Sequence, residues 1–159
     1  MTDEEILVAG ALSTWDGAIE KADKLFPNLT PEELLKEVAP GRNRLIYLWG
    51  HLTATHDRML LLLSIGQRLH PEFDVVFLCT PDKVSVIPTP QELKNSWAEV
   101  NERLRAGFAT LSAFDWLQKH TSVSDEDFTK DPLRNRFAIL LSRTNHLSYH
   151  LGQAVLVSN

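Results

Sequence analysis

The chain of 159 residues contains a single cysteine, Cys79, which excludes an internal disulfide and any metal site built from several thiolates. It has no cluster of Lys and Arg, and its formal net charge is −5, so a nucleic-acid-binding surface is not expected. The longest hydrophobic run, from Met59 to Leu63, is much too short to span a bilayer. The acidic start of the chain does not resemble a signal peptide. We therefore expect a cytoplasmic protein with neither a nucleic-acid nor a membrane partner.

The composition is that of a globular protein, with 43% hydrophobic and 23% charged residues. A chain of this length buries enough apolar surface for one core, so we predict a single domain over residues 1–159.

Four long segments have the hydrophobic periodicity of α-helices, over about residues 3–25, 42–65, 89–111 and 131–157. A short helix is predicted over 31–38. Thr30 and Thr89 each precede Pro and, two residues further on, Glu, which is the signature of a capped helix start. The last segment is apolar nearly all round, which predicts that it is the most enclosed helix.

The second and third helices are separated by a proline-rich stretch that is not predicted to be helical. Within it, residues 74–79 (DVVFLC) favour a strand or a buried extended strap, and residues 114–130 form a second extended connection. Long connections allow neighbouring helices to run parallel. The predicted fold is therefore all-α: a four-helix bundle with long crossover connections, in the order up-down-down-up.

Two of the six histidines, His146 and His150, are four residues apart on the last helix. Both imidazoles then point the same way, which is the spacing that helices use to bind one metal ion. The alternative is that one histidine caps a backbone carbonyl and the other lies in the core. The zinc-protease motif is excluded because Leu147 stands where its glutamate would be, and no Glu-x-x-His unit of a di-iron bundle is present.

A third ligand would have to come from another helix, and His51 and His56 both lie on the second one. A helical wheel places His56 slightly nearer the centre of the buried stripe, or leaves the two tied. His70 and His120 fall in connections and are expected to be solvated.

Two stretches resemble the DinB-like (DinB/YfiT) superfamily of metal-dependent bundle proteins. Residues 48–58 (LWGHLTATHDR) are similar to its second-helix pattern, and residues 145–153 (NHLSYHLGQ) to the HxxxHxGQ sequence of its last helix, except at Leu151, where a basic residue is commoner. The resemblance implies a bundle in which the second and last helices converge on a metal site. Carried over by position, the ligands are His51, His146 and His150, with His56 as the alternative to His51.

Three imidazoles leave coordination positions open, as catalytic sites do, and they suit zinc or nickel. The superfamily includes thiol-dependent transferases and isomerases, and many of its members are dimers. The resemblance therefore implies a homodimeric, metal-dependent transferase that uses a low-molecular-weight thiol on a small-molecule substrate, or a hydrolase. A non-catalytic metal- or small-molecule-binding bundle, or a scaffold with a vestigial pocket, are the other hypotheses.

Three polar side chains of the last helix are candidates for a supporting role at the site. Arg143, Asn145 and Gln153 lie on or beside the histidine face of the last helix, where they can orient an imidazole or meet an anionic substrate, or simply be polar residues at a helix edge. No general acid or base stands out.

Four other residues have mainly structural expectations. Asp57 should face solvent, Cys79 should be a small buried hydrophobe, and Trp49 is available for an inter-subunit contact. Tyr149 either reaches the mouth of a cavity or is buried against a neighbouring helix.

Overall fold

The computed structural model describes residues 1–158, so the last position of the predicted domain lies outside the described residues. These residues form helices and connections without a named strand, which confirms the all-α class. Four helices are long: α1 (Asp3–Leu25), α3 (Leu45–Leu62), α4 (Pro90–Phe108) and α7 (Arg136–Val157). The short ones are η1 (Phe26–Asn28), α2 (Pro31–Leu34), η2 (Val75–Cys79), α5 (Ala113–Trp116) and α6 (Asp125–Lys130).

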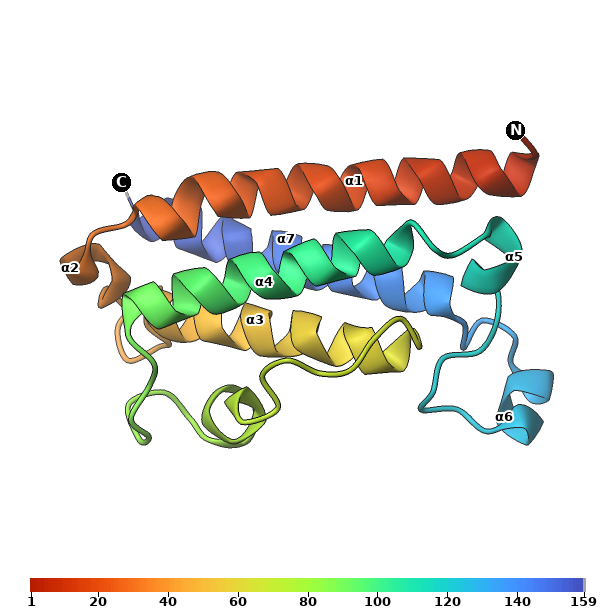
Figure 1. Cartoon of the computed structure of the whole chain (residues 1–159). Coiled ribbons are helices and arrows are strands. Elements are labelled where there is room, and N and C mark those ends of the chain that lie inside the picture. Colours follow the sequence, from red (N-terminus) through yellow and green to blue (C-terminus); the bar gives the residue numbers. More distant parts are fainter. Residues whose placement is uncertain (159) are drawn as a thin grey trace.

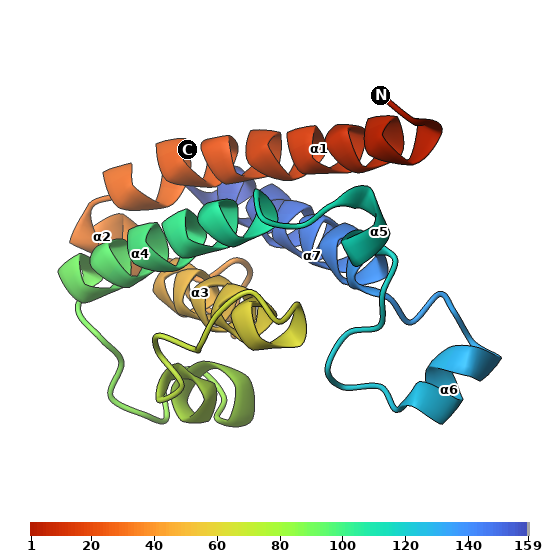
Figure 2. The ribbon, with the colours of Figure 1, turned by 45° about the vertical axis from the view of Figure 1, so that its right-hand side comes forward.

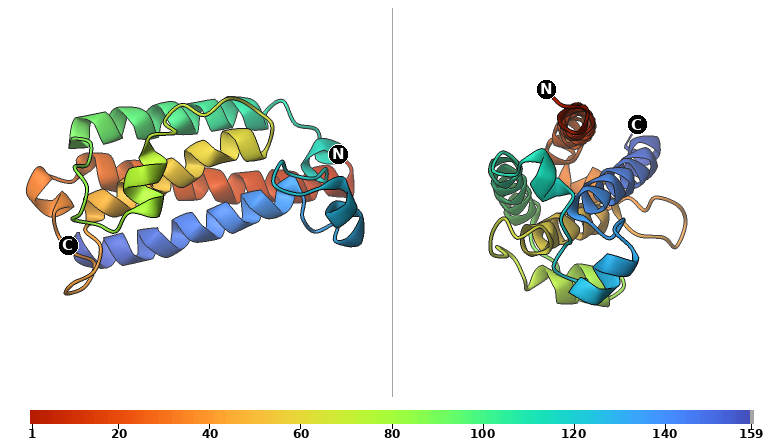
Figure 3. Two further views of the ribbon diagram at one scale, coloured as in Figure 1. Left: turned by 90° about the horizontal axis from the view of Figure 1, so that it is seen from below. Right: turned by 90° about the vertical axis from the view of Figure 1, so that its right-hand side faces the viewer.

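The long helices lie side by side, with α1 and α7 running in one direction and α3 and α4 in the other (Figure 1). The turned views in Figures 2 and 3 show the same arrangement, with α6 standing off one end. Contacts join α3 to both α4 and α7, and α1 to α7. As a result, α3 and α7 are antiparallel neighbours, which decides what the two helices can build between them.

Local sequence sets where the helices begin. Thr2, Thr30 and Thr89 each accept a hydrogen bond from the backbone N–H of the glutamate three residues on, and that glutamate accepts one from the threonine N–H. These capping boxes satisfy N–H groups that have no partner inside the helix. The predicted starts at Thr30 and Thr89 are therefore confirmed, whereas α3 begins at Leu45 and α7 at Arg136, later than predicted.

The most enclosed helix is α3 and not α7, so the prediction from composition is wrong. Buried residues occupy 14 positions of α3 but only 5 of α7. The reason is placement: α3 is covered by α4, α7 and η2, whereas α7 leaves Leu141, Val155 and Leu156 exposed. Composition alone does not show on how many sides a helix has neighbours.

The connections also differ from the extended segments predicted. Residues 75–79 form the π-helical turn η2, with Phe77 buried against the Tyr47 ring, and the stretch 114–130 contains α6 and most of α5. Because η2 is a helical turn rather than a strap, it presents Phe77 to the core and leaves Cys79 exposed instead of buried.

Two more expectations are corrected by tertiary contacts. Trp49 is buried and stacks on Phe26, so it is not available for an inter-subunit contact. Asp57 is wholly buried instead of solvated, because it accepts hydrogen bonds from Arg68 and from the backbone N–H groups of Leu69 and His70. These bonds fix the connection that follows α3.

Within residues 1–158, none of the helices has both the length and the apolar character that crossing a membrane requires.

Candidate metal centre

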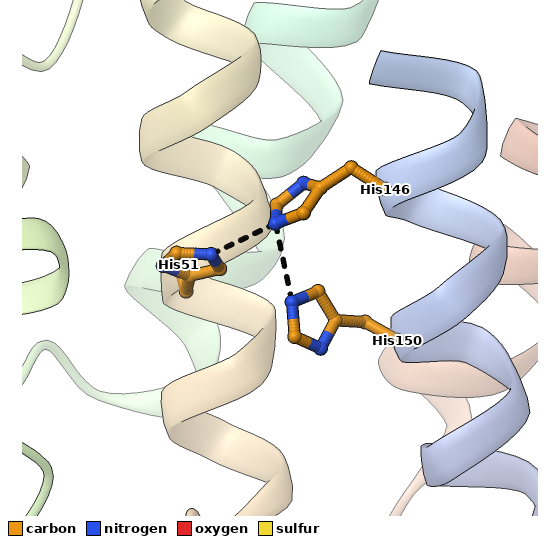
Figure 4. A group of neighbouring side chains, drawn as sticks. All are labelled: His51, His146 and His150. Atoms are coloured by element: carbon orange, nitrogen blue, oxygen red, sulfur yellow. Dashed lines mark hydrogen bonds between the residues drawn. The ribbon is translucent and has the colours of Figure 1, made fainter. Parts of the chain in front are cut away.

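The interface between α3 and α7 brings three histidines together. Nε2 of His146 lies 3.0 Å from Nε2 of His51 and 3.1 Å from Nε2 of His150 (Figure 4). One ligand nitrogen from each residue lies within 4.8 Å of the other two. His51 lies in the first half of α3, and His146 and His150 lie at the middle of α7 and one turn beyond it, so the antiparallel packing of these helices is what makes the three meet.

A backbone carbonyl fixes the protonation of His51. Its Nδ1 lies 3.0 Å from the carbonyl oxygen of Phe77 in η2. A carbonyl oxygen only accepts hydrogen bonds, so Nδ1 carries the proton and donates it. A neutral imidazole has one N–H, which leaves the lone pair of Nε2 directed at His146.

The side chain of Gln153 fixes the protonation of His150 in the same way. The Nδ1–H of His150 donates to Oε1 of Gln153 over 2.7 Å, so its Nε2 also presents a lone pair to His146. His146 has at most one proton on Nε2 and cannot direct it well at two acceptors. A cation between the three nitrogens resolves this conflict: bonds of about 2.0–2.1 Å in tetrahedral geometry place ligand nitrogens roughly 3.3 Å apart. The residues present therefore fit a metal ion.

A comparison with known protein families places the sequence in one of them. The sequence model of the DinB superfamily matches residues 14–154, which include all three histidines. The chain belongs to the DinB superfamily. No curated protein matches it.

Burial keeps the three imidazoles of this DinB-superfamily chain uncharged. It lowers the pKa of His51, His146 and His150, and that of His146 falls to about 4, with smaller contributions from the charges of the other two and of Arg143. At neutral pH all three are therefore in the state that binds a metal ion, because a protonated imidazole has no free lone pair.

His56, the alternative to His51, lies outside this group. It is completely buried, its Nδ1 is 2.9 Å from Oδ1 of Asn101, and its ring lies between Trp15 and Trp97. His70 and His120 are also elsewhere. Both are partly buried rather than fully solvated, and His70 contacts the carboxylates of Glu72 and Glu99.

A cavity of about 660 Å³ reaches the DinB-superfamily histidine group from one side. Its walls include His150, Tyr149, Gln153 and Arg42. Tyr149 is exposed, with its ring 5.1 Å from that of His150, in line with the expectation that it reaches a cavity mouth. A small molecule in this cavity can therefore touch a candidate ligand.

The hydrophobic periodicity does not predict the contact between η2 and α3, although the glycine at position 50 indicates it. A Cβ added at Gly50 would lie 2.2 Å from the Phe77 ring, so only glycine lets η2 approach this closely. A glycine inside a helix lowers its stability by about 1 kcal/mol relative to alanine and often marks close packing. Here the approach places the Phe77 carbonyl against the neighbouring residue, His51.

Proposed function

We propose that this member of the DinB superfamily is a metal-dependent enzyme that holds one divalent ion, zinc or nickel, on His51, His146 and His150. The observation that carries the proposal is the convergence of imidazole nitrogens at 3.0 and 3.1 Å, two of them with lone pairs fixed by donated hydrogen bonds. Hydrogen bonding alone leaves one lone pair without a donor. A cation satisfies all three nitrogens.

A site with three protein ligands supports catalysis because it leaves room for a further ligand. The ion, when bound, would act as a Lewis acid or lower the pKa of a coordinated water or thiol. The chain's own residues orient the ligands: the Phe77 carbonyl holds the His51 ring, and Gln153 holds the His150 ring. The adjacent cavity of about 660 Å³ has the size of a small-molecule site.

The reaction proposed is group transfer involving a low-molecular-weight thiol as cofactor, or a hydrolysis, on a small-molecule substrate. The alternative is a non-catalytic bundle that binds a metal or a small molecule. One observation favours the alternative: among the described residues, no Asp or Glu belongs to the group, so no carboxylate is at hand as a general base.

We propose further that the four long helices form one up-down-down-up bundle over residues 1–159, and that the protein acts in the cytoplasm as a homodimer. The directions of α1, α3, α4 and α7 in Figure 1 support that order. Leu156 and Val155 line an apolar groove between α1 and α7, a surface that a second copy can cover.

Metal analysis of protein purified without a histidine tag tests the site. We expect about one equivalent of divalent metal per chain, and loss of most of it in His146→Ala. His70→Ala is the matched control, because the His70 side chain contacts Glu72, Glu99 and the Phe73 ring and lies outside the group of three histidines. Metal at three orders of magnitude above its Kd should stabilise the wild type by about 4 kcal/mol and leave His146→Ala unchanged. If His146→Ala still contains one equivalent of metal per chain, the assignment of the ligands is wrong.

Incubation of the loaded protein with a panel of small thiols and electrophiles separates the two candidate functions. We expect thiol consumption that depends on both metal and His146. Unchanged thiol levels across the panel, with metal bound, would favour the non-catalytic bundle.

A further inference from the structure

A second cavity lies along the same α3–α7 interface, on the other side of the histidine group. Its volume is about 470 Å³. Leucine and isoleucine side chains form part of its wall, and the polar part consists of Arg58, Arg68, Arg143, His120, Thr121 and Ser122. Three arginines thus line one cavity in a chain whose net charge is −5.

The cavity begins close to the candidate metal centre. Arg143 precedes His146 by three residues on α7, a rise of about 4.5 Å, and Arg58 follows His51 by seven residues on α3, about 10.5 Å. Because α3 and α7 are antiparallel, both displacements lead toward the same end of the molecule (Figure 1). The two arginines and the three histidines therefore line one continuous interface.

Two of the arginines are neutralised by nearby carboxylates, and the third is not. Arg58 pairs with Asp74, and Arg68 pairs with both Asp57 and Asp74. Within residues 1–158, Arg143 forms no ion pair, and its buried Nε has no hydrogen-bond partner. Three guanidinium groups thus face two carboxylates, which leaves one positive charge in excess.

An unpaired, half-buried guanidinium is unfavourable unless something compensates it. Burial lowers the pKa of Arg143, and the charge of Arg58 lowers it further, yet an arginine stays protonated at neutral pH. Desolvating such a charge without a partner weakens the folded state. An anion in the cavity removes that penalty, and a guanidinium binds the two oxygens of a carboxylate or phosphate in a fork.

We propose that this cavity binds an oxyanion, the carboxylate or phosphate group of a small molecule, and that Arg143 is its principal ligand. As a statement about anion binding the proposal is independent of any metal. As a statement about substrate it rests on the proposed function: the substrate is anionic, with its acidic group held by Arg143 and its reacting end one helical turn away, toward His146.

Titration of the full-length chain with inorganic phosphate and with succinate tests the anion site, using isothermal calorimetry in chloride buffer after dialysis against a chelator. Because the metal has been removed, the measured binding cannot arise from an anion that is coordinated to a metal ion. We expect saturable binding that is at least tenfold weaker in Arg143→Gln and unchanged in Arg103→Gln, the same substitution on an exposed arginine of α4. Tighter phosphate identifies a phosphorylated ligand, and tighter succinate a carboxylate. Equal binding by the wild type and Arg143→Gln would overturn the proposal.

Thermal unfolding in chloride distinguishes a ligand from a structural arginine. Because Arg143 is unpaired, Arg143→Gln should keep or raise the melting temperature, and Arg143→Lys should restore part of the phosphate or succinate affinity. A melting temperature lowered by several degrees in Arg143→Gln would show a structural role and contradict the assignment. The anion site should persist in His146→Ala. If the metal proposal fails, the anion site therefore remains, but without the link to a substrate.

Discussion

Two histidines five residues apart on α3 have opposite surroundings. His51 faces α7, where its Nε2 meets a second imidazole at 3.0 Å, and it is only partly buried. His56 is completely buried between Trp15 and Trp97, and its one hydrogen-bond partner among the described residues is Asn101. A separation of five residues turns the helix by about 140°, which is enough to direct the two rings at different neighbours.

The difference shows that burial by itself does not make a site. His56 is the more buried of the two and its pKa is lowered further, to about 3. Yet Asn101 is its one hydrogen-bond partner among the described residues, and His56 belongs to no group of candidate ligands. His51 belongs to a group because lone pairs from α3 and α7 converge there. We therefore expect His56 to contribute to stability and His51 to binding.

Replacing His56 gives the largest expected effect on stability. His56→Ala removes a buried ring and leaves Oδ1 of Asn101 without its partner, which should lower the free energy of unfolding by about 3 kcal/mol. Urea unfolding of metal-free protein measures this, and metal content should remain at about one equivalent per chain. Loss of metal with unchanged stability would reverse the roles assigned to His56 and His51.

The pH dependence of stability gives a second test of the buried, uncharged state of His56. The pKa of His56 is about 3 in the folded state, against an ordinary 6.5, because burial disfavours its charged form. Between these values the unfolded chain binds the proton and the folded chain does not, so stability falls as the pH drops below 6.5. From pH 7 to 4.5 this costs about 2–3 kcal/mol, and His56→Gln should lose that much less. The other buried histidines titrate in both proteins and cancel. Identical pH dependence in urea unfolding would contradict the assignment.

Local features were predictable from the sequence because they depend on residues near one another in the chain. The capped starts at Thr30 and Thr89 follow from a spacing of three residues. The pairing of His146 with His150 follows from helix geometry alone. Between His51 and His56, periodicity leaned slightly toward His56 or left the two tied, and the resemblance favoured His51, which is the one that lies beside the pair.

Features that depend on distant residues were not predictable. Asp57 is buried because Arg68 and the connection after α3 fold back over it, and no local pattern reports that contact. The same holds for the Phe77 carbonyl, which reaches His51 from 26 residues away. The excess charge of Arg143 likewise emerges only when Arg58 and Arg68 are seen to be paired with carboxylates.

The smallest expected effect concerns a residue that touches a candidate ligand and not the metal. Gln153→Ala removes the acceptor of the His150 Nδ1–H and frees the ring to rotate or change tautomer. Metal affinity should fall roughly tenfold, equivalent to about 1.4 kcal/mol, and far less than in His146→Ala. Competition with a chromophoric chelator at pH 7 measures this, with Gln91→Ala on the exposed start of α4 as the matched control.

Gln153→Glu sharpens the comparison, because a carboxylate also accepts the Nδ1–H bond and makes the imidazole more basic. Its metal affinity should equal or exceed that of the wild type, while Gln153→Ala lies below it. Equal affinity in Gln153→Ala and the wild type would show that the tautomer of His150 is not held by this contact.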